Sequence, residues 1–323
     1  MAERVVQVRR KEERTATTAG PGAGRTFVIL NPAAGGARAR RLRDRVLGAF
    51  EARRHAVELV ETEGPGHATA LARAAAQQGY AAVCAVGGDG TLAETATALA
   101  GTGLPLAIVP RGTANQLAAN LAIPRDVETA VGLVLNGRVV QVDVGTVGDR
   151  IFALAAGAGF DAAVMARATT ELKERWGFGA YIYAMLKEAA LIPRAHYRIV
   201  ADGQELHVEA MSVLVANVGA IFAAFPPMRM PVTPTPEKAL SDGLFDIVIM
   251  EPASAPRFAG TLLRLAFRGF GGQGLLHLQA REVRIDADPV APYEVDGDFV
   301  GHTPLVASVL PGALRVLVPN HIP

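Results

Sequence analysis

The chain has 323 residues, of which 50% are hydrophobic, 20% charged and 6% aromatic, and its formal net charge is +1. This composition excludes a disordered or low-complexity protein, and the near-neutral charge provides no basic field for nucleic acid. The single cysteine, Cys84, excludes a disulfide framework and a cysteine-rich metal site. The length favours two domains over one.

The first 25 residues are charged and then rich in glycine, proline and threonine, without the apolar stretch of a signal peptide. We expect them to form a flexible tail. The longest apolar stretch, residues 210–225, is interrupted by Ser212, Asn217 and Gly219. Because a membrane span requires about 20 continuous apolar residues, we expect a cytoplasmic protein that can still contact the inner membrane face peripherally.

Short apolar runs alternate with turns and amphipathic segments between residues 26 and 121. The pattern predicts strands at 26–30, 57–60, 81–86 and 106–109, and helices at 37–54, 67–77, 91–100 and 113–121. Strands that alternate with helices over short connections are typical of an open parallel sheet. We therefore predict a Rossmann-like α/β domain over residues 26–143.

Extended segments predominate after about residue 139. Strands are predicted at 139–144, 151–155, 197–201, 205–218, 244–250, 282–287 and 313–318. Hairpin-type turns at 147–150 and 201–204 join some of them, and a helical insert is predicted at 161–191, with a second option at 256–270. The pattern favours an antiparallel, two-layer β domain over 144–303, and the strand at 313–318 could belong to either domain.

Three glycine-containing loops each end a predicted strand and begin a predicted helix. They are Asn31-Pro-Ala-Ala-Gly-Gly36, Gly87-Gly-Asp-Gly-Thr91 and Pro110-Arg-Gly-Thr-Ala-Asn115. Ligands bind at the carboxyl ends of parallel strands, where main-chain amides at helix starts bind anionic oxygens. Asp89, an acid in the second loop, is better suited to hold a metal or orient water than to touch phosphate. The chain lacks a GxxxxGK[ST] motif, which excludes a P-loop enzyme.

These loops, together with three later motifs, resemble the diacylglycerol-kinase-like lipid kinases, which include bacterial diacylglycerol kinases, sphingosine kinases and YegS-like proteins. The later motifs are Ala158-Gly-Phe-Asp-Ala162, Ser241-Asp-Gly-Leu-Phe-Asp246 and Val295-Asp-Gly-Asp298. The resemblance covers nearly the whole chain after Arg25. It implies a β-sandwich second domain, a last strand (304–320) that returns to the nucleotide domain, and phosphorylation of a hydroxyl of diacylglycerol or a related lipid with ATP and Mg²⁺.

The resemblance also implies roles for individual residues. The ATP contacts would come from Asn31, Pro32, Ala33, Ala34, Gly35, Thr62, Gly87, Gly88, Asp89, Gly90, Thr91, Glu94 and Thr113. Magnesium would bind Asp242 and the main-chain carbonyls of Ala239 and Leu244. Asp298, with Asp296 beside it, would accept the proton of the lipid hydroxyl, and Asp89 completes the catalytic acids. No phosphate-clamping lysine is visible, and Arg111 is either the cation of this site or a solvated loop arginine.

The chain departs from the family pattern at two positions that bear on the reaction. The usual Asp-Gly-Glu is here Asp296-Gly-Asp298, and Gln116 follows the third loop where the family has aspartate. Two alternatives therefore stay open: an NAD-kinase-like enzyme, because that group shares the Gly-Gly-Asp-Gly-Thr turn, and a nucleotide-binding regulatory module without transfer activity. The partners expected are a lipid substrate, a membrane surface and, as an option, a second copy in a homodimer.

Overall fold

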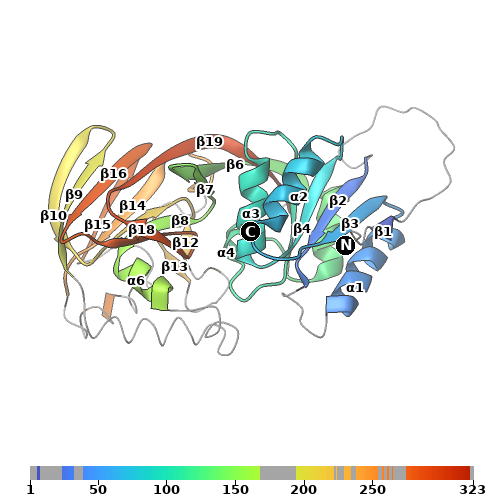
Figure 1. Cartoon of the computed structure of the whole chain (residues 1–323), viewed down its shortest axis with the longest axis horizontal. Coiled ribbons are helices and arrows are strands. Elements are labelled where there is room, and N and C mark those ends of the chain that lie inside the picture. Colours follow the sequence, from blue (N-terminus) through green and yellow to red (C-terminus); the bar gives the residue numbers. More distant parts are fainter. Residues whose placement is uncertain are drawn as a thin grey trace. The chain divides into compact units, whose positions relative to one another are not determined.

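The computed structural model describes residues 6–7, 24–32, 39–167, 194–221, 223, 229–233, 238–253, 257, 260–261, 264 and 274–320. The chain divides into two compact units (Figure 1), the first made of Met1–Val142 and Ala313–Pro323 and the second of Asp143–Gly312. Each unit has a hydrophobic core of its own. Within the described residues, no helix combines the length and hydrophobicity needed to span a bilayer.

The first unit is built on a parallel sheet. Its strands are β2 (Thr26–Leu30), β3 (Val57–Glu61), β4 (Ala82–Gly87), β5 (Leu106–Pro110) and the last part of β19 (Leu305–Val318), in the order β3-β2-β4-β5-β19. All neighbouring pairs of this series are parallel, while the short β1 (Val6–Gln7) joins β3 antiparallel. Strands β2, β4 and β5 are buried along their whole length, which explains their uninterrupted apolar sequences. The predicted parallel sheet is confirmed.

Helices cover this sheet. Helices α1 (Ala39–Ala52) and α5 (Val127–Asn136) contribute Phe50 and Val131 to one core with Val28 and Val109 of the sheet. Helices α2 (His67–Ala76) and α3 (Asp89–Leu99) contact each other, and they also contact β2 and β4, respectively. The sequence pattern did not predict α5, although Asp126 marks its start by accepting a hydrogen bond from the Thr129 N–H at 2.9 Å.

Helices α3 and α4 (Gln116–Asn120) begin at other residues than predicted. Helix α3 begins at Asp89, two residues early, because the extended backbone of Gly88 serves as its N-cap and an acid is favoured in the first turn. Helix α4 begins three residues late, because Asn115 has a left-handed backbone, with φ 47°. The carboxyl edge of the sheet is therefore shaped by loop geometry that helical periodicity does not reveal.

The second unit contains two antiparallel sheets. One has the order β15-β14-β11-β8-β17-β18 and the other pairs β10 with β9, β9 with β16 and β16 with the first part of β19. Their bounds are β8 (Ala155–Gly159), β9 (Ala195–Ala201), β10 (Gln204–Ala210), β11 (Ser212–Ala216), β14 (Phe245–Met250), β15 (Leu275–Ala280), β16 (Glu282–Asp288), β17 (Pro292–Val295) and β18 (Asp298–His302). Tyr197 and Ile285 of one sheet share a core with Val213 and Ile247 of the other. The predicted antiparallel two-layer architecture is confirmed.

Smaller elements complete the second unit. Strand β6 (Arg138–Val147) forms a hairpin with β7 (Arg150–Phe152), and β12 (Ala220–Ile221) pairs with β13 (Met230–Pro231). Helix α6 (Phe160–Arg167) is the described part of the predicted insert, whereas residues 168–193 and most of 256–270 lie outside the described residues. The turns at 147–150 and 201–204 are confirmed as hairpin turns.

Some strands differ from the expectation. The segment predicted as one strand at 205–218 forms β10 and β11, which are separated at Met211. Strand β7 ends at Phe152, before the predicted end at residue 155, and β8 begins at Ala155. Strands β15, β17 and β18 were not predicted. β15 and β18 include exposed polar positions, and β17 begins at a proline, so none of them gives the apolar pattern used for prediction.

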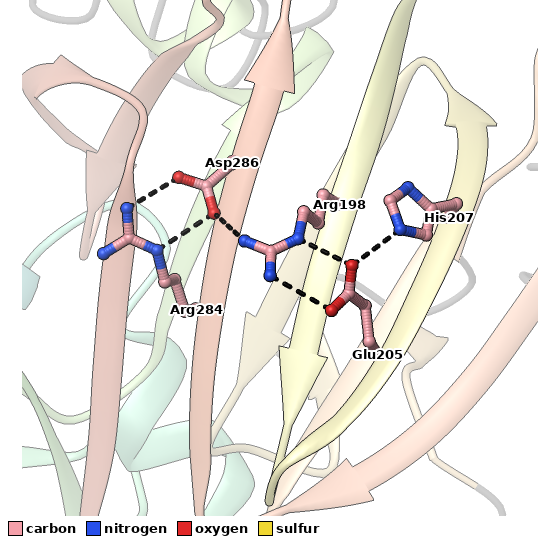
Figure 2. Close-up of polar contacts among 5 residues, drawn as sticks. All are labelled: Arg198, Glu205, His207, Arg284 and Asp286. Atoms are coloured by element: carbon pink, nitrogen blue, oxygen red, sulfur yellow. Dashed lines mark hydrogen bonds and ion pairs between the residues drawn. The ribbon is translucent and has the colours of Figure 1, made fainter.

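A row of ionisable side chains crosses the exposed face of β16, β9 and β10 (Figure 2). Arg198 donates two hydrogen bonds to Glu205, at 2.7 and 3.0 Å, and lies 3.7 Å from Asp286. Arg284 and His207 extend the row at its two ends. The hydrogen bonds from Arg198, and then from His207, lower the pKa of Glu205 to about 2.

Candidate active site

The three glycine-containing loops of the first unit are fastened to one another at the carboxyl edge of its sheet. The N–H of Asn31, after β2, donates to the carbonyl of Val86 at 2.9 Å, and the N–H of Arg111, after β5, donates to the carbonyl of Gly87 at 2.7 Å. The Asn31 side chain also donates to Thr91 Oγ1 at 3.0 Å. The structure therefore brings the predicted residues Asn31, Gly87 and Thr91 together with Arg111 of the third loop.

The second and third loops touch through their main chains. A Cβ added to Gly112 would lie 2.5 Å from the Cα of Gly88, and one added to Gly88 would lie 3.1 Å from the Cα of Gly112. A Cβ on Gly87 would meet the Thr91 side chain at 2.6 Å. In contrast, a Cβ on Gly90 would meet nothing within 4 Å. A side chain at position 112 would thus force the two loops apart, and one at position 88 would require a small shift of Gly112.

Asp89, in the second loop, holds the third loop in place through hydrogen bonds. Its two carboxylate oxygens accept the N–H groups of Asn115 and Gln116, at 2.7 and 2.6 Å. Burial raises the pKa of Asp89 despite these hydrogen bonds, which act in the opposite direction. The geometry gives this acid a positioning contact in addition to the catalytic or metal-binding role expected from sequence.

Asn115 is a residue of the site that sequence reasoning missed. Its side chain accepts the N–H of Gly112 at 2.8 Å and donates to the carbonyl of the same residue at 2.6 Å. Asparagine is common in turns because its side chain can replace main-chain partners and because it tolerates a left-handed backbone. The Gly-Thr-Ala-Asn sequence contained this signal.

The remaining predicted nucleotide residues lie in different settings. The carboxylate of Glu94 accepts the N–H groups of Gly66 and Ala68, at 2.8 and 3.0 Å, so this acid caps the start of α2. Thr62 follows β3, its N–H donating to the carbonyl of Leu30 at 2.8 Å. Thr113 is exposed. Pro32 directly follows Asn31, whereas residues 33–35, Ala33, Ala34 and Gly35, lie outside the described residues.

In the second unit, the turn between β17 and β18 carries the two acids predicted to accept a proton. Asp296 accepts the N–H groups of Ala153, Leu154 and Ala155, at 3.0, 2.9 and 3.1 Å, and has a left-handed backbone with φ 49°. Asp298, the first residue of β18, is exposed. The first acid therefore fixes the shape of the turn, while the second faces solvent.

The segment that contains Asp242 is held by another buried acid. Asp143 accepts the N–H groups of Gly243 and Gly312, both at 2.7 Å, and its own N–H donates to the carbonyl of Leu240. Gly243 has a left-handed backbone, with φ 73°. Asp143 thus positions the segment from which Asp242 projects. The place of Asp143 near a turn in the sequence indicates a structural acid but does not identify the segment that it holds.

Negative charge accumulates around Asp242. Partial burial, and then the charges of Asp246 and Asp143, raise its pKa against a hydrogen bond from Leu244. Asp246 is buried, and its Oδ1 lies 2.7 Å from His277 Nε2, while its Oδ2 has no hydrogen-bond partner among the residues that the structure describes. The described residues contain no group of three or more His, Cys, Asp or Glu side chains at metal-binding distances. A cation bound here would therefore take other ligands from carbonyls or water.

Comparisons with known proteins assign both halves of the chain. Residues 25–147 match the family model of the diacylglycerol kinase catalytic domain, and residues 155–318 match that of the YegS C-terminal NAD kinase beta sandwich-like domain. A diacylglycerol kinase of Mycobacterium tuberculosis is 30% identical over 313 residues, which cover 92% of this chain and 96% of the relative.

The chain is also similar to a further relative and to a solved structure. An uncharacterized protein of Synechocystis, sll0036, is 30% identical over 247 residues, and the match spans only 56% of its length. A crystal structure of a diacylglycerol kinase from Bacillus anthracis aligns with a TM-score of 0.71 at 21% identity, covering 92% of this chain and 97% of that one, and supports the fold. The chain therefore belongs to the diacylglycerol-kinase-like family of lipid kinases, and it is a kinase.

Proposed function

We propose that this kinase transfers the γ-phosphoryl group of ATP to a hydroxyl of diacylglycerol or a closely related lipid, with Mg²⁺ as its metal and Asp298 as the proton acceptor. The observation that carries the proposal is the different environment of the two acids in the β17–β18 turn. Asp296 is occupied by three amides, whereas Asp298 is exposed beside it. A free carboxylate on a fixed turn is suited to accept a proton from a hydroxyl.

The glycine loops support the nucleotide part of the proposal. Phosphoryl transfer depends mainly on positioning the phosphates and on neutralising their charge with oriented donors. Close packing of Gly88 against Gly112, and the hydrogen bonds from Asn115 and Gln116 to Asp89, hold the start of α3 and the third loop together. We include in this proposal that ATP is contacted by the three loops and by Thr62, Glu94 and Thr113.

The chemistry around Asp242 fits a divalent cation. Burial, and then the charges of Asp246 and Asp143, raise the pKa of Asp242, and among the described residues Oδ2 of buried Asp246 has no hydrogen-bond partner, so negative charge gathers at this segment. Asp242 would hold the cation with the carbonyls of Ala239 and Leu244. When bound, Mg²⁺ would neutralise phosphate charge and help position the groups that react. Asp143 would keep the segment in place through Gly243.

Apolar side chains on the second unit support contact with a lipid surface. Phe299 directly follows Asp298 and is 49% exposed, and Val290 is 63% exposed. Exposed aromatic and aliphatic groups gain free energy when they leave water for a lipid surface. We therefore include peripheral membrane contact in the proposal, which co-sedimentation with vesicles would test. Homodimer formation stays a prediction, for which sedimentation velocity is the measurement.

The central experiment measures phosphate transfer from labelled ATP to diacylglycerol in detergent micelles. We expect Asp298→Asn to lower kcat about 10²- to 10⁴-fold, the usual contribution of a general base, with an unchanged Tm. The matched control is Asp149→Asn, because Asp149 is an exposed acid in the β6–β7 turn of the same unit. Equal turnover of the two variants would contradict the role of Asp298.

Two further arms address the alternatives. Incubation with NAD and ATP, scored for NADP, tests the NAD-kinase-like reading. Stabilisation by ATP without transfer to any lipid of a cell extract would favour a regulatory module over an enzyme of lipid phosphorylation. The proposal requires lipid turnover in the same preparation, and failure to phosphorylate any lipid while ATP binding persists would overturn it.

A further inference from the structure

Arg111 lies at the junction of the second and third loops, and its side chain lacks a full set of partners. Its main-chain N–H donates to the carbonyl of Gly87 at 2.7 Å, and the next residue, Gly112, packs against Gly88. The Nε atom of its guanidinium is buried and has no hydrogen-bond partner within the described part of the chain. A buried donor without an acceptor costs free energy, so such a group in a native protein calls for an explanation.

The surrounding sequence makes this guanidinium more informative. Residues 24–142 contain no lysine. Among the described residues of the loops that follow β2, β3, β4 and β5, Arg111 is the only arginine. Arg125 also reaches the third loop, but its Nη2 is occupied by the carbonyl of Gly112 at 3.0 Å. Arginine presents several donors in a planar fork that matches phosphate oxygens.

We infer that Arg111 binds a phosphate of the nucleotide through its guanidinium, in the place that a lysine takes in many other ATP-binding proteins. This inference rests on the proposed nucleotide site in the first unit. An acceptor oxygen would satisfy the buried Nε, and the hydrogen bond between the Arg111 N–H and Gly87 places the residue beside the turn that leads into α3. Arg111 is thus a phosphate-binding residue of this chain, in contrast to a solvated loop arginine.

The test compares nucleotide binding by the wild type and by Arg111→Gln, Arg111→Lys and Arg125→Gln, measured by calorimetry with ATP, ADP and adenosine. We expect Arg111→Gln to weaken ATP binding about 10- to 100-fold, the range for a hydrogen bond to a charged group, and to leave adenosine binding unchanged. Arg111→Lys should recover part of the loss, because it restores the charge without the fork. Arg125→Gln should change ATP affinity less than threefold.

The outcomes separate this inference from the function on which it rests. If the wild type binds no ATP, the proposed nucleotide site fails. If the wild type binds ATP and Arg111→Gln binds it equally well, the inference about Arg111 is overturned while the site stands. If Arg111→Gln weakens ATP and adenosine binding equally, or if it lowers the Tm of the protein without nucleotide, Arg111 has a structural role in the loop. Either result would also overturn the inference.

Discussion

The glycine loops of the first unit and the acidic turn of the second use carboxylates in the same way but leave different groups for chemistry. In both regions an acid accepts main-chain amides of a neighbouring segment: Asp89 accepts two and Asp296 three. Beyond these contacts, the loops leave main-chain atoms of glycines and the Arg111 guanidinium, whereas the turn leaves the exposed carboxylate of Asp298. The role of an acid inside a motif therefore depends on its hydrogen-bond partners, because the motif sequence alone does not distinguish a structural acid from a reactive one.

The largest expected effect on stability is at the turn of the second unit. Asp296→Ala should lower the free energy of unfolding by about 2–4 kcal/mol, because it leaves three amides without their acceptor. Asp298→Ala should change it by less than about 0.5 kcal/mol, as expected for an exposed side chain. Urea unfolding followed by circular dichroism measures both values.

These two variants test whether Asp296 and Asp298 have different roles. Similar losses for the two variants would mean that Asp298 also has a structural role, and its assignment as a free carboxylate would be wrong. Asp296→Asn supplies the conservative control, since asparagine keeps one acceptor oxygen and tolerates the left-handed backbone at this position.

The contact between the second and third glycine loops should not tolerate a side chain at position 112. Gly112→Ala should destabilise the protein by about 1–3 kcal/mol, because the new Cβ would lie 2.5 Å from the Cα of Gly88 and the loops would have to separate. Gly90→Ala is the matched control for stability, since its Cβ would meet nothing within 4 Å inside α3. We expect this control to be neutral or stabilising, given the helix propensity of alanine. Thermal unfolding of the two variants would show whether the close approach matters, and equal Tm values would argue against it.

The smallest effect is a pH dependence that arises from Asp89. Its pKa in the folded chain is raised above the ordinary value of 3.8, mainly by burial. An acid with a raised folded pKa contributes stability that is fully present below the unfolded pKa and is lost as pH rises through the folded pKa. The stability of the wild type relative to Asp89→Asn should therefore fall as pH rises through this window. Chemical unfolding at a series of pH values measures this difference, and a rise with pH would indicate that the hydrogen bonds outweigh burial.

Much of the fold could be predicted from sequence because the buried strands are uninterrupted apolar runs. Strands β2 and β5 are examples, and their glycine turns placed the site at the carboxyl edge of the sheet. The start of α4 could not be predicted in this way, because it depends on the left-handed backbone of Asn115 and on its bonds to Gly112. The role of Asp143 was equally hidden, since Gly243 and Gly312 are far from it in sequence.

The path of β19 has a consequence for synthesis of the chain. The first unit consists of residues 1–142 and 313–323, so the part of β19 that pairs with β5 is made only after the whole second unit has been translated. A nascent chain that ends before residue 313 leaves one edge of β5 without this partner, and open strand edges favour association with other chains. Completion of the first unit must therefore wait for its distant final strand, and truncation upstream of that strand would leave an intermediate that is prone to association with other chains.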